Sequence, residues 1–262
     1  MPAGKPNAEL QVNAALVRRL LADQHPDLAT LPLSHLDSGW DNVIFRLGST
    51  LTVRVPRRQL GAELVANEQT WLPVLAPRLP VPISAPVRVG QPTDYYPWPW
   101  SVLPYFEGEC ADLRPPASGE ALRFADFLLA LHGPAPLDAP QNPLRGIPLR
   151  GRQASTVERM AGLREQNVLV GRDRSIRAVI DWGDVSRGDV ATDLAGIWAL
   201  FELTEDRQRI VEQYNPDRAT LARARGWAVV FAVVLADSGL INSPRHAGAG
   251  AAILGRLALD AA

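Results

Sequence analysis

The stretch NVLVGRDRSIRAVIDWGDVSRGDVATDLA, residues 167–195, decides the fold class of this chain. Its first half contains two apolar, β-branched runs, residues 168–170 and 176–180, on either side of a charged turn. This pattern predicts a short β-hairpin. Asn167 and Asp181 stand at the edges of its two arms, so we expect their side chains to converge on one point.

Asn167 and Asp181 both offer oxygen atoms, the ligands that Mg²⁺ prefers in proteins. Taken alone, Asn167 is an ordinary turn residue and Asp181 an ordinary capping residue. Taken as a pair on one hairpin, they predict a site for a complex of magnesium with a nucleotide.

The composition excludes several classes of partner. The 262 residues include 27 Lys or Arg and 28 Asp or Glu, so no overall field favours nucleic acid or a membrane surface, and we expect neither. Cys110 is the only cysteine, which excludes an internal disulfide and fits a reducing compartment. There is no signal-like N-terminus, and the apolar run at residues 227–236 is too short to span a bilayer, so we expect a cytoplasmic protein.

Changes in residue pattern, many of them at prolines, predict two lobes. The N-terminal lobe, residues 1–104, is expected to contain a helix at 10–21, hairpin strands at 43–47 and 51–55, a helix at 61–79, and further strands within 81–90 and 98–108. The C-terminal lobe, residues 105–262, is expected to hold the hairpin and helices at 118–133, 190–201, 204–214 and 218–240, with Ser118 as an N-cap. The fold class is therefore α+β, with a small sheet in the first lobe and mainly helix in the second.

A second pair of residues points to phosphate chemistry. Arg54 ends the second hairpin strand, and Glu68 lies on the helix that follows. Phosphoryl transfer depends mostly on positioning and charge neutralisation, which a strand cation held by a helix carboxylate provides. The alternative is a surface ion pair, worth at most about 1 kcal/mol. The segment SGWDN, residues 38–42, precedes the first hairpin strand and could turn over phosphates, although Gly and Asn are also ordinary turn residues.

Further segments extend the pattern over the whole chain. They are SGWDNVIFRLG (38–48), LTVRVPRR (51–58), ELVANEQTWLP (63–73), YPWPWSVLPYFEGE (96–109), NPLRGIPL (142–149), NVLV (167–170), AVIDWGDVSRGDVATDLA (178–195) and RARGWA (223–228). Together they resemble the aminoglycoside phosphotransferase family, and within it the branch related to macrolide phosphotransferases. The resemblance implies a bilobal protein-kinase-like fold.

The resemblance also implies ligands: ATP or GTP and magnesium as cofactors, and a small molecule with a hydroxyl group, such as an antibiotic, as substrate. The residues it implies are Asn167 and Asp181 for magnesium, Arg54 and Glu68 for phosphate, and the hinge residues Leu103, Tyr105 and Phe106 for the base. Arg54 occupies a position that is usually lysine in this family. Asp193 is expected to be part of the framework.

One part of the family pattern is missing. Members carry a loop like H-G-D-L-H-x-x-N, whose aspartate accepts the proton of the substrate hydroxyl. Counted back from Asn167, the eight residues here are MAGLREQN, which puts Gly162 at the position of the aspartate. Glycine cannot accept a proton, so no catalytic residue is assigned. The short spacing after residue 149 indicates an internal deletion with its junction near residues 160–165.

Such a deletion would remove helices from the centre of the C-terminal lobe, so we expect this lobe to repack, to form a homodimer or to be marginally stable. The resemblance places Asp184 and Asp189 after the metal ligand, on the wrong side of the phosphate for a replacement base. For the substrate pocket, Glu202, Glu205 and Asp206 are candidates, or else a solvated helix face.

The sequence therefore predicts a phosphotransferase that uses ATP and magnesium and acts on a small hydroxyl compound. The alternative is a pseudokinase that binds nucleotide without useful turnover. A third hypothesis is a remnant that binds no ligand.

Overall fold

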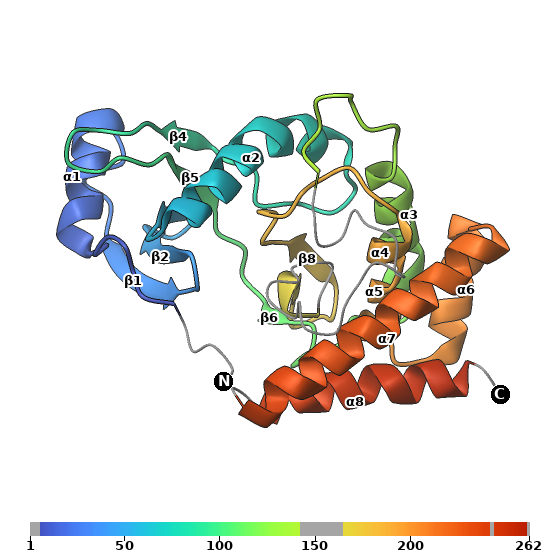
Figure 1. The fold of residues 1–262 in the computed structure, drawn as a ribbon. Helices are drawn as coiled ribbons and strands as arrows, with labels where there is room; N and C mark the ends of the chain where they lie inside the picture. The colour runs from blue at the N-terminus through green and yellow to red at the C-terminus, as the bar shows by residue number, and fades with distance from the viewer. Residues whose placement is uncertain (1–5, 142–164, 242–243, 261–262) are drawn as a thin grey trace. The chain divides into compact units, whose positions relative to one another are not determined.

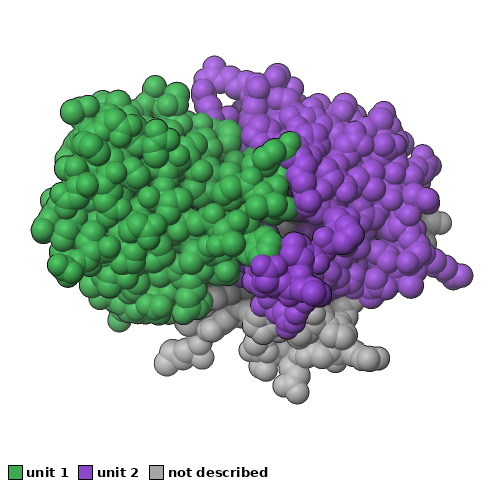
Figure 2. Space-filling model, turned by 90° about the horizontal axis from the view of Figure 1, so that it is seen from above, with its two compact units in different colours: residues 1–77, 83–106 green, residues 78–82, 107–262 purple. Residues whose placement is uncertain are grey.

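A computed structural model describes residues 6–141, 165–241 and 244–260 of the chain (Figure 1). The chain forms two compact units, coloured separately in Figure 2. Unit 1 comprises Met1–Pro77 and Ile83–Phe106, and unit 2 comprises Arg78–Pro82 and Glu107–Ala262. The sequence-based division between residues 104 and 105 stays a prediction. The α+β class is confirmed.

Unit 1 is built on a five-stranded antiparallel sheet in the order β1-β2-β3-β5-β4. Its elements are α1 (Ala14–Gln24), β1 (Leu33–Ser38), β2 (Asn42–Leu47), β3 (Leu51–Pro56), α2 (Gln59–Leu75), β4 (Arg88–Gly90) and β5 (Trp100–Pro104). The predicted hairpin is confirmed as β2 and β3. Strand β1 was not predicted, because its side chains are mostly exposed and polar and show no alternation of apolar residues.

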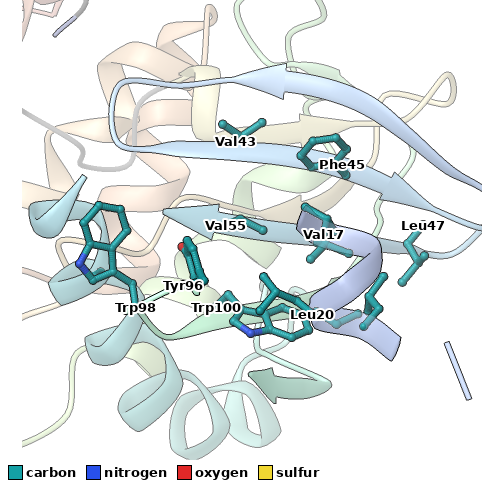
Figure 3. Close-up of a cluster of buried hydrophobic side chains, with 13 residues drawn as sticks. Val17, Leu20, Val43, Phe45, Leu47, Val55, Tyr96, Trp98 and Trp100 are labelled. Atoms are coloured by element: carbon teal, nitrogen blue, oxygen red, sulfur yellow. The ribbon is translucent and has the colours of Figure 1, made fainter. Parts of the chain in front are cut away.

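The core of unit 1 lies between the sheet and α1 (Figure 3). Val43, Phe45 and Leu47 alternate along β2 and are all buried, as the period of two in a strand requires. Full burial of such a side chain contributes roughly 1.5–3 kcal/mol. Helix α1 begins four residues later than predicted, because Asn13 caps it: its side-chain oxygen accepts from the Leu16 N–H at 2.9 Å.

Unit 2 combines a three-stranded sheet, in the order β6-β7-β8, with six helices in the described part of the chain. Its elements are β6 (Glu109–Cys110), α3 (Glu120–Leu131), β7 (Val168–Val170), β8 (Ile176–Val179), α4 (Ala191–Leu194), α5 (Gly196–Leu200), α6 (Thr204–Tyr214), α7 (Arg218–Ile241) and α8 (Pro244–Leu259). The hairpin predicted from residues 168–180 is confirmed. The single helix expected at 190–201 is two short helices, and Ser118 is not the N-cap of α3, since Gly119 holds that place without a side-chain bond.

The last two helices, α7 and α8, pack closely against each other. Gly250 permits this approach, because a Cβ there would lie 2.5 Å from the Ala232 carbonyl oxygen. Within α7, Arg218–Asp237 contains an 18-residue window with a mean hydropathy of 1.5, which by length and composition alone could cross a membrane. Because 44% of this window is buried, against α4 and α8 among others, packing inside unit 2 also explains why the window is apolar.

Candidate functional site

Arg54 on β3 and Glu68 on α2 form an ion pair in the interior of unit 1. Arg54 Nη1 lies 2.6 Å from Glu68 Oε1, and the two side chains are 9% and 1% exposed. The alternative of a surface ion pair is therefore wrong. Gln69 holds α2 on the sheet, since its amide donates to the Trp100 carbonyl at 2.9 Å and to Ser101 Oγ at 3.0 Å. Because Glu68 holds the Arg54 guanidinium in place, the guanidinium can bind an anion with little reorganisation.

Residues 39–41 form the turn between β1 and β2, so the segment 38–42 leads into the first hairpin strand as predicted, but it follows a strand, β1, that was not predicted. The Gly39 N–H donates to the Asn42 carbonyl at 2.9 Å, and the Arg57 N–H donates to the Asp41 carbonyl at 2.8 Å. Gly61 on α2 lies directly against this turn, because a Cβ there would lie 2.4 Å from the Asp41 carbonyl oxygen. The turn is thus held against the start of α2 by its backbone.

The predicted hinge begins at the end of β5. Leu103 is buried and pairs with Thr52 on β3, and the Tyr105 N–H donates to the Thr50 carbonyl at 2.7 Å. The Tyr105 ring lies under the guanidinium of Arg46, with Cζ 3.1 Å from the ring centroid, which is a cation–π contact. These contacts hold the first part of the hinge against β3.

The backbone beyond β5 is oriented by the same register. Alternate residues of a strand in an antiparallel sheet bond to opposite neighbours, and the Val102 carbonyl accepts from the Val87 N–H, so the Pro104 carbonyl is directed to the same side as that of Val102. Phe106 lies beyond the end of β5. Strand β4 ends its pairing at Arg88, opposite Val102, before it reaches these residues. Base contacts by Leu103, Tyr105 and Phe106 stay a prediction.

Asn167 and Asp181 lie together at one end of the β7–β8 hairpin in unit 2. The Ile180 N–H donates to the Asn167 carbonyl at 2.8 Å, which continues the ladder past Val168 and Val179. Asp181 has φ 62°, a left-handed conformation that is uncommon outside glycine and more frequent for Asp and Asn. The carboxylate of Asp181 is on an exposed residue. An amide and a carboxylate oxygen here fit the ligand preference of magnesium.

Trp182, next to Asp181, fixes the chain where it leaves the hairpin. Its indole Nε1–H donates to the Val179 carbonyl at 2.9 Å, and its ring packs edge-on against Phe127 of α3, 6.3 Å between centroids. With 9% of its surface exposed, Trp182 anchors the segment in the core. The unusual backbone at Asp181 is therefore supported from the following residue.

Two other acidic residues near this segment, Asp189 and Asp193, make structural contacts. Arg223 donates to both carboxylate oxygens of Asp189, at 2.5 and 3.1 Å. Partial burial alone would raise the pKa of Asp189, but the bonds from Arg223 and the Ala191 N–H outweigh it and hold this pKa below its ordinary value. Asp193 lies 3.2 Å from His132 Nε2 and so joins α4 to the end of α3. Asp189 is thus a poor proton acceptor.

The three candidate pocket residues differ in environment. Glu202 is exposed and lies 3.8 Å from Arg256, and Glu205 is exposed as well. Asp206 is 5% exposed and lies 3.8 Å from Arg209, so it does not belong to a solvated helix face. Their role toward a substrate stays a prediction.

Gly162 and the rest of segment 142–164 lie outside the described residues, so the predicted junction near 160–165 stays a prediction. Among the residues that the structure describes, no three His, Cys, Asp or Glu side chains form a metal-binding group.

Sequence reasoning also missed Asn42, which it treated as a turn residue. Asn42 is buried beside Arg54.

These features define the class of protein: a two-unit α+β fold of the protein-kinase type, with a buried strand cation in one unit and an oxygen-rich hairpin end in the other. The sequence matches the profile described as "Phosphotransferase enzyme family" over residues 32–160 and 161–227. The chain therefore belongs to this family. No curated protein sequence matched the chain.

Several solved structures share the fold. The GDP complex of wild-type aminoglycoside 2'-phosphotransferase-IIIa has a TM-score of 0.66 at 17% identity, covering 95% of this chain and 100% of that one. The GDP and kanamycin complex of APH(2")-IIia has 0.66 at 15% identity, covering 94% and 99%. Macrolide 2'-phosphotransferase MphH from Brachybacterium faecium has 0.57 at 17% identity, covering 91% and 97%. All three share the kinase-like fold with this chain.

Proposed function

We propose that this protein binds a nucleoside triphosphate, ATP or GTP, with magnesium and transfers a phosphoryl group to a hydroxyl of a small molecule. The buried ion pair of Arg54 with Glu68 carries the proposal. Burial of a cation needs a reason beyond stability, because an apolar pair of similar size is often as stable or more stable. A fixed positive charge beside bound phosphates is such a reason in a member of a phosphotransferase family.

The solved structures with this fold support the choice of ligands. They include a complex with GDP and kanamycin, one with ADP, and one with ATP and streptomycin. Two others are named as macrolide 2'-phosphotransferases. Aminoglycosides and macrolides are therefore the substrate classes that we propose to test first.

The residues have separate tasks in this proposal. Arg54 would bind phosphate oxygens, with Glu68 keeping its side chain extended, and the hinge residues Leu103, Tyr105 and Phe106 would contact the base. Asn167 and Asp181 would hold magnesium, which supplies charge neutralisation of the phosphates when bound. Trp182 keeps Asp181 in place.

The catalytic base is the weak point of this proposal. Gly162 has no acceptor, and Asp189 is engaged by Arg223 with a lowered pKa. A loose transition state asks more of positioning than of a base, so we expect slow transfer. The second candidate function, nucleotide binding without useful turnover, is favoured by the same glycine. The two blocks of the family match meet between residues 160 and 161, close to the proposed deletion junction.

Thermal shift and phosphoryl transfer, measured side by side, distinguish these functions. The wild type is expected to gain stability with Mg-ATP or Mg-GTP, and Asp181→Ala to lose that gain. Transfer to a panel of aminoglycosides and macrolides is expected to be slow. Rapid transfer would overturn the interpretation of Gly162, whereas no shift with either nucleotide would support the remnant hypothesis.

A second variant tests the deletion. If MAGLREQN is the junction of a deletion and not a diverged catalytic loop, Gly162→Asp will leave the transfer rate unchanged, since the carboxylate has no catalytic loop around it. A large gain in rate for Gly162→Asp, with the nucleotide Kd unchanged, would show a diverged loop and contradict the deletion.

A further inference from the structure

Asn42, the first residue of β2, is a third buried polar residue beside Arg54 and Glu68. The exposed fractions of the three residues are 7%, 8% and 1%. In the β2–β3 register Ile44 lies opposite Arg54, so Asn42 is two residues along the neighbouring strand and on the same face. Two adjacent strands and one helix thus bring the three side chains together.

The amide of Asn42 is oriented with its oxygen toward Arg54, because the opposite orientation would place an NH₂ group against guanidinium donors. The oxygen then accepts from Arg54 Nε at 3.2 Å and from Nη2 at 3.1 Å. Glu68 accepts from the remaining nitrogen, Nη1, at 2.6 Å. The two partners therefore hold different nitrogens and fix the plane of the guanidinium.

This arrangement suits an arginine in particular. A lysine ammonium is a compact charge that one carboxylate can hold, whereas a guanidinium is planar and must also be oriented. The backbone around Asn42 is rigid enough for the task. Its carbonyl accepts from Gly39, and the preceding residue, Asp41, is bonded to Arg57.

The chemistry of the two partners also differs in charge. Glu68 places one negative charge against the arginine, and Asn42 adds an acceptor without adding a second negative charge. An aspartate at position 42 would hold the guanidinium equally well, since Arg–carboxylate bonds are strong, but two carboxylates against one guanidinium leave a net charge of about −1. That charge would repel phosphate.

We propose that Asn42 is a positioning residue that orients Arg54 for the phosphates of the bound nucleotide without adding a second negative charge beside it. The proposal rests on the proposed function, in which Arg54 binds those phosphates. It adds a residue to the site that the sequence treated only as part of a turn.

The test is a titration with a fluorescent ATP analogue and magnesium, together with urea unfolding of the same samples. The proteins are wild type, Asn42→Ala, Asn42→Asp, Arg54→Lys and the double variant Asn42→Ala with Arg54→Lys. Asn42→Ala is expected to raise the Kd about tenfold, as expected for losing a hydrogen bond to a charged group. Asn42→Asp is expected to raise it at least as much, although it restores an acceptor for Arg54.

The double variant separates positioning from general structure. Once residue 54 is lysine, the Asn42→Ala change is expected to alter the Kd by less than about twofold, because the two residues act as a unit. If Asn42→Asp binds as the wild type does, Asn42 is a structural acceptor only and the proposal is overturned. Equal effects of Asn42→Ala in the wild-type and Arg54→Lys backgrounds would overturn it as well.

Failure of the proposed function gives a different result. A wild type that binds no nucleotide, with a normal unfolding transition, would overturn both the proposed function and the positioning role. A wild type that binds while Asn42→Ala binds equally well would overturn the role of Asn42 alone.

Discussion

The two parts of the candidate site differ in how the fold holds them. Arg54 and Glu68 in unit 1 are buried, paired at 2.6 Å and held by a strand and a helix. Asp181 in unit 2 is exposed, and its position is set by a left-handed backbone and by the anchored Trp182 next to it. The residues proposed to bind phosphate are therefore part of the folded core, whereas the proposed magnesium ligand Asp181 is a surface residue whose position is set by its backbone.

This comparison predicts that substitutions of the residues proposed to bind phosphate change both folding and binding. Glu68→Ala should have the largest effect, a loss of about 3–5 kcal/mol in the free energy of unfolding, because it leaves a buried arginine without its carboxylate. Urea unfolding measures this loss. Glu63→Ala is the matched control, since Glu63 is an exposed residue of the same helix and should change stability by no more than about 0.5 kcal/mol. Equal effects for the two variants would contradict the buried-pair account.

A second buried pair tests whether burial, and not membership of unit 1, is the cause. Arg207 in α6 is almost fully buried and donates to Asp260 Oδ2 at 2.8 Å and to Asp260 Oδ1 at 2.5 Å. Asp260→Ala is expected to cost about 3 kcal/mol at neutral pH, the lower end of the range for breaking a buried pair, since Asp260 is slightly exposed. A loss in the free energy of unfolding no larger than that of an ordinary surface substitution would contradict burial as the cause.

The same pair predicts a pH dependence. Burial raises the pKa of Asp260, but the hydrogen bonds from Arg207 and Trp198 lower this pKa by more than burial raises it. The pKa of Asp260 therefore lies below its ordinary value. Because the unfolded chain binds the proton more tightly, the carboxylate stabilises the fold above the unfolded pKa, about 3.9. This contribution is lost as the pH falls through the lower folded pKa. Urea unfolding from pH 6 to pH 2 should show a shallower loss in Asp260→Asn than in the wild type.

The smallest expected change in stability is at the proposed magnesium ligand. Asp181→Ala should alter the free energy of unfolding by no more than about 0.5 kcal/mol, because the side chain belongs to an exposed residue. Urea unfolding without magnesium measures this value. A loss as large as that of Glu68→Ala would mean that Asp181 is a core residue in solution.

Much of the fold could be predicted because periodicity reports burial. The apolar runs of β2, β3 and β7 bury alternate or continuous side chains, and these patterns are local. Helix α8 was not predicted because it contains several glycines, which lower helix propensity. Its stability comes from packing on α7, where Gly250 allows close contact, and such packing is not visible in a local pattern.

For the site, the sequence identified two pairs of residues on neighbouring elements: Arg54 and Glu68, which have opposite charges, and Asn167 and Asp181, which both offer oxygen ligands. Arg54 and Glu68 were found because a strand cation and a helix carboxylate form a recognisable pair. Asn42 was missed because its role depends on strand register and on the orientation of an amide, and the sequence alone shows only an asparagine beside a turn.

The central claim is the proposal that this chain binds a magnesium–nucleotide complex, with Arg54 for phosphate and with Asn167 and Asp181 for magnesium. Calorimetric titration of the wild type with ATP, with and without magnesium, tests this claim most directly. The account predicts saturable binding of one nucleotide per chain, strengthened by magnesium in the wild type but not in Asp181→Ala. Absence of heat or saturation with ATP and with GTP, in a protein that unfolds cooperatively, would contradict it.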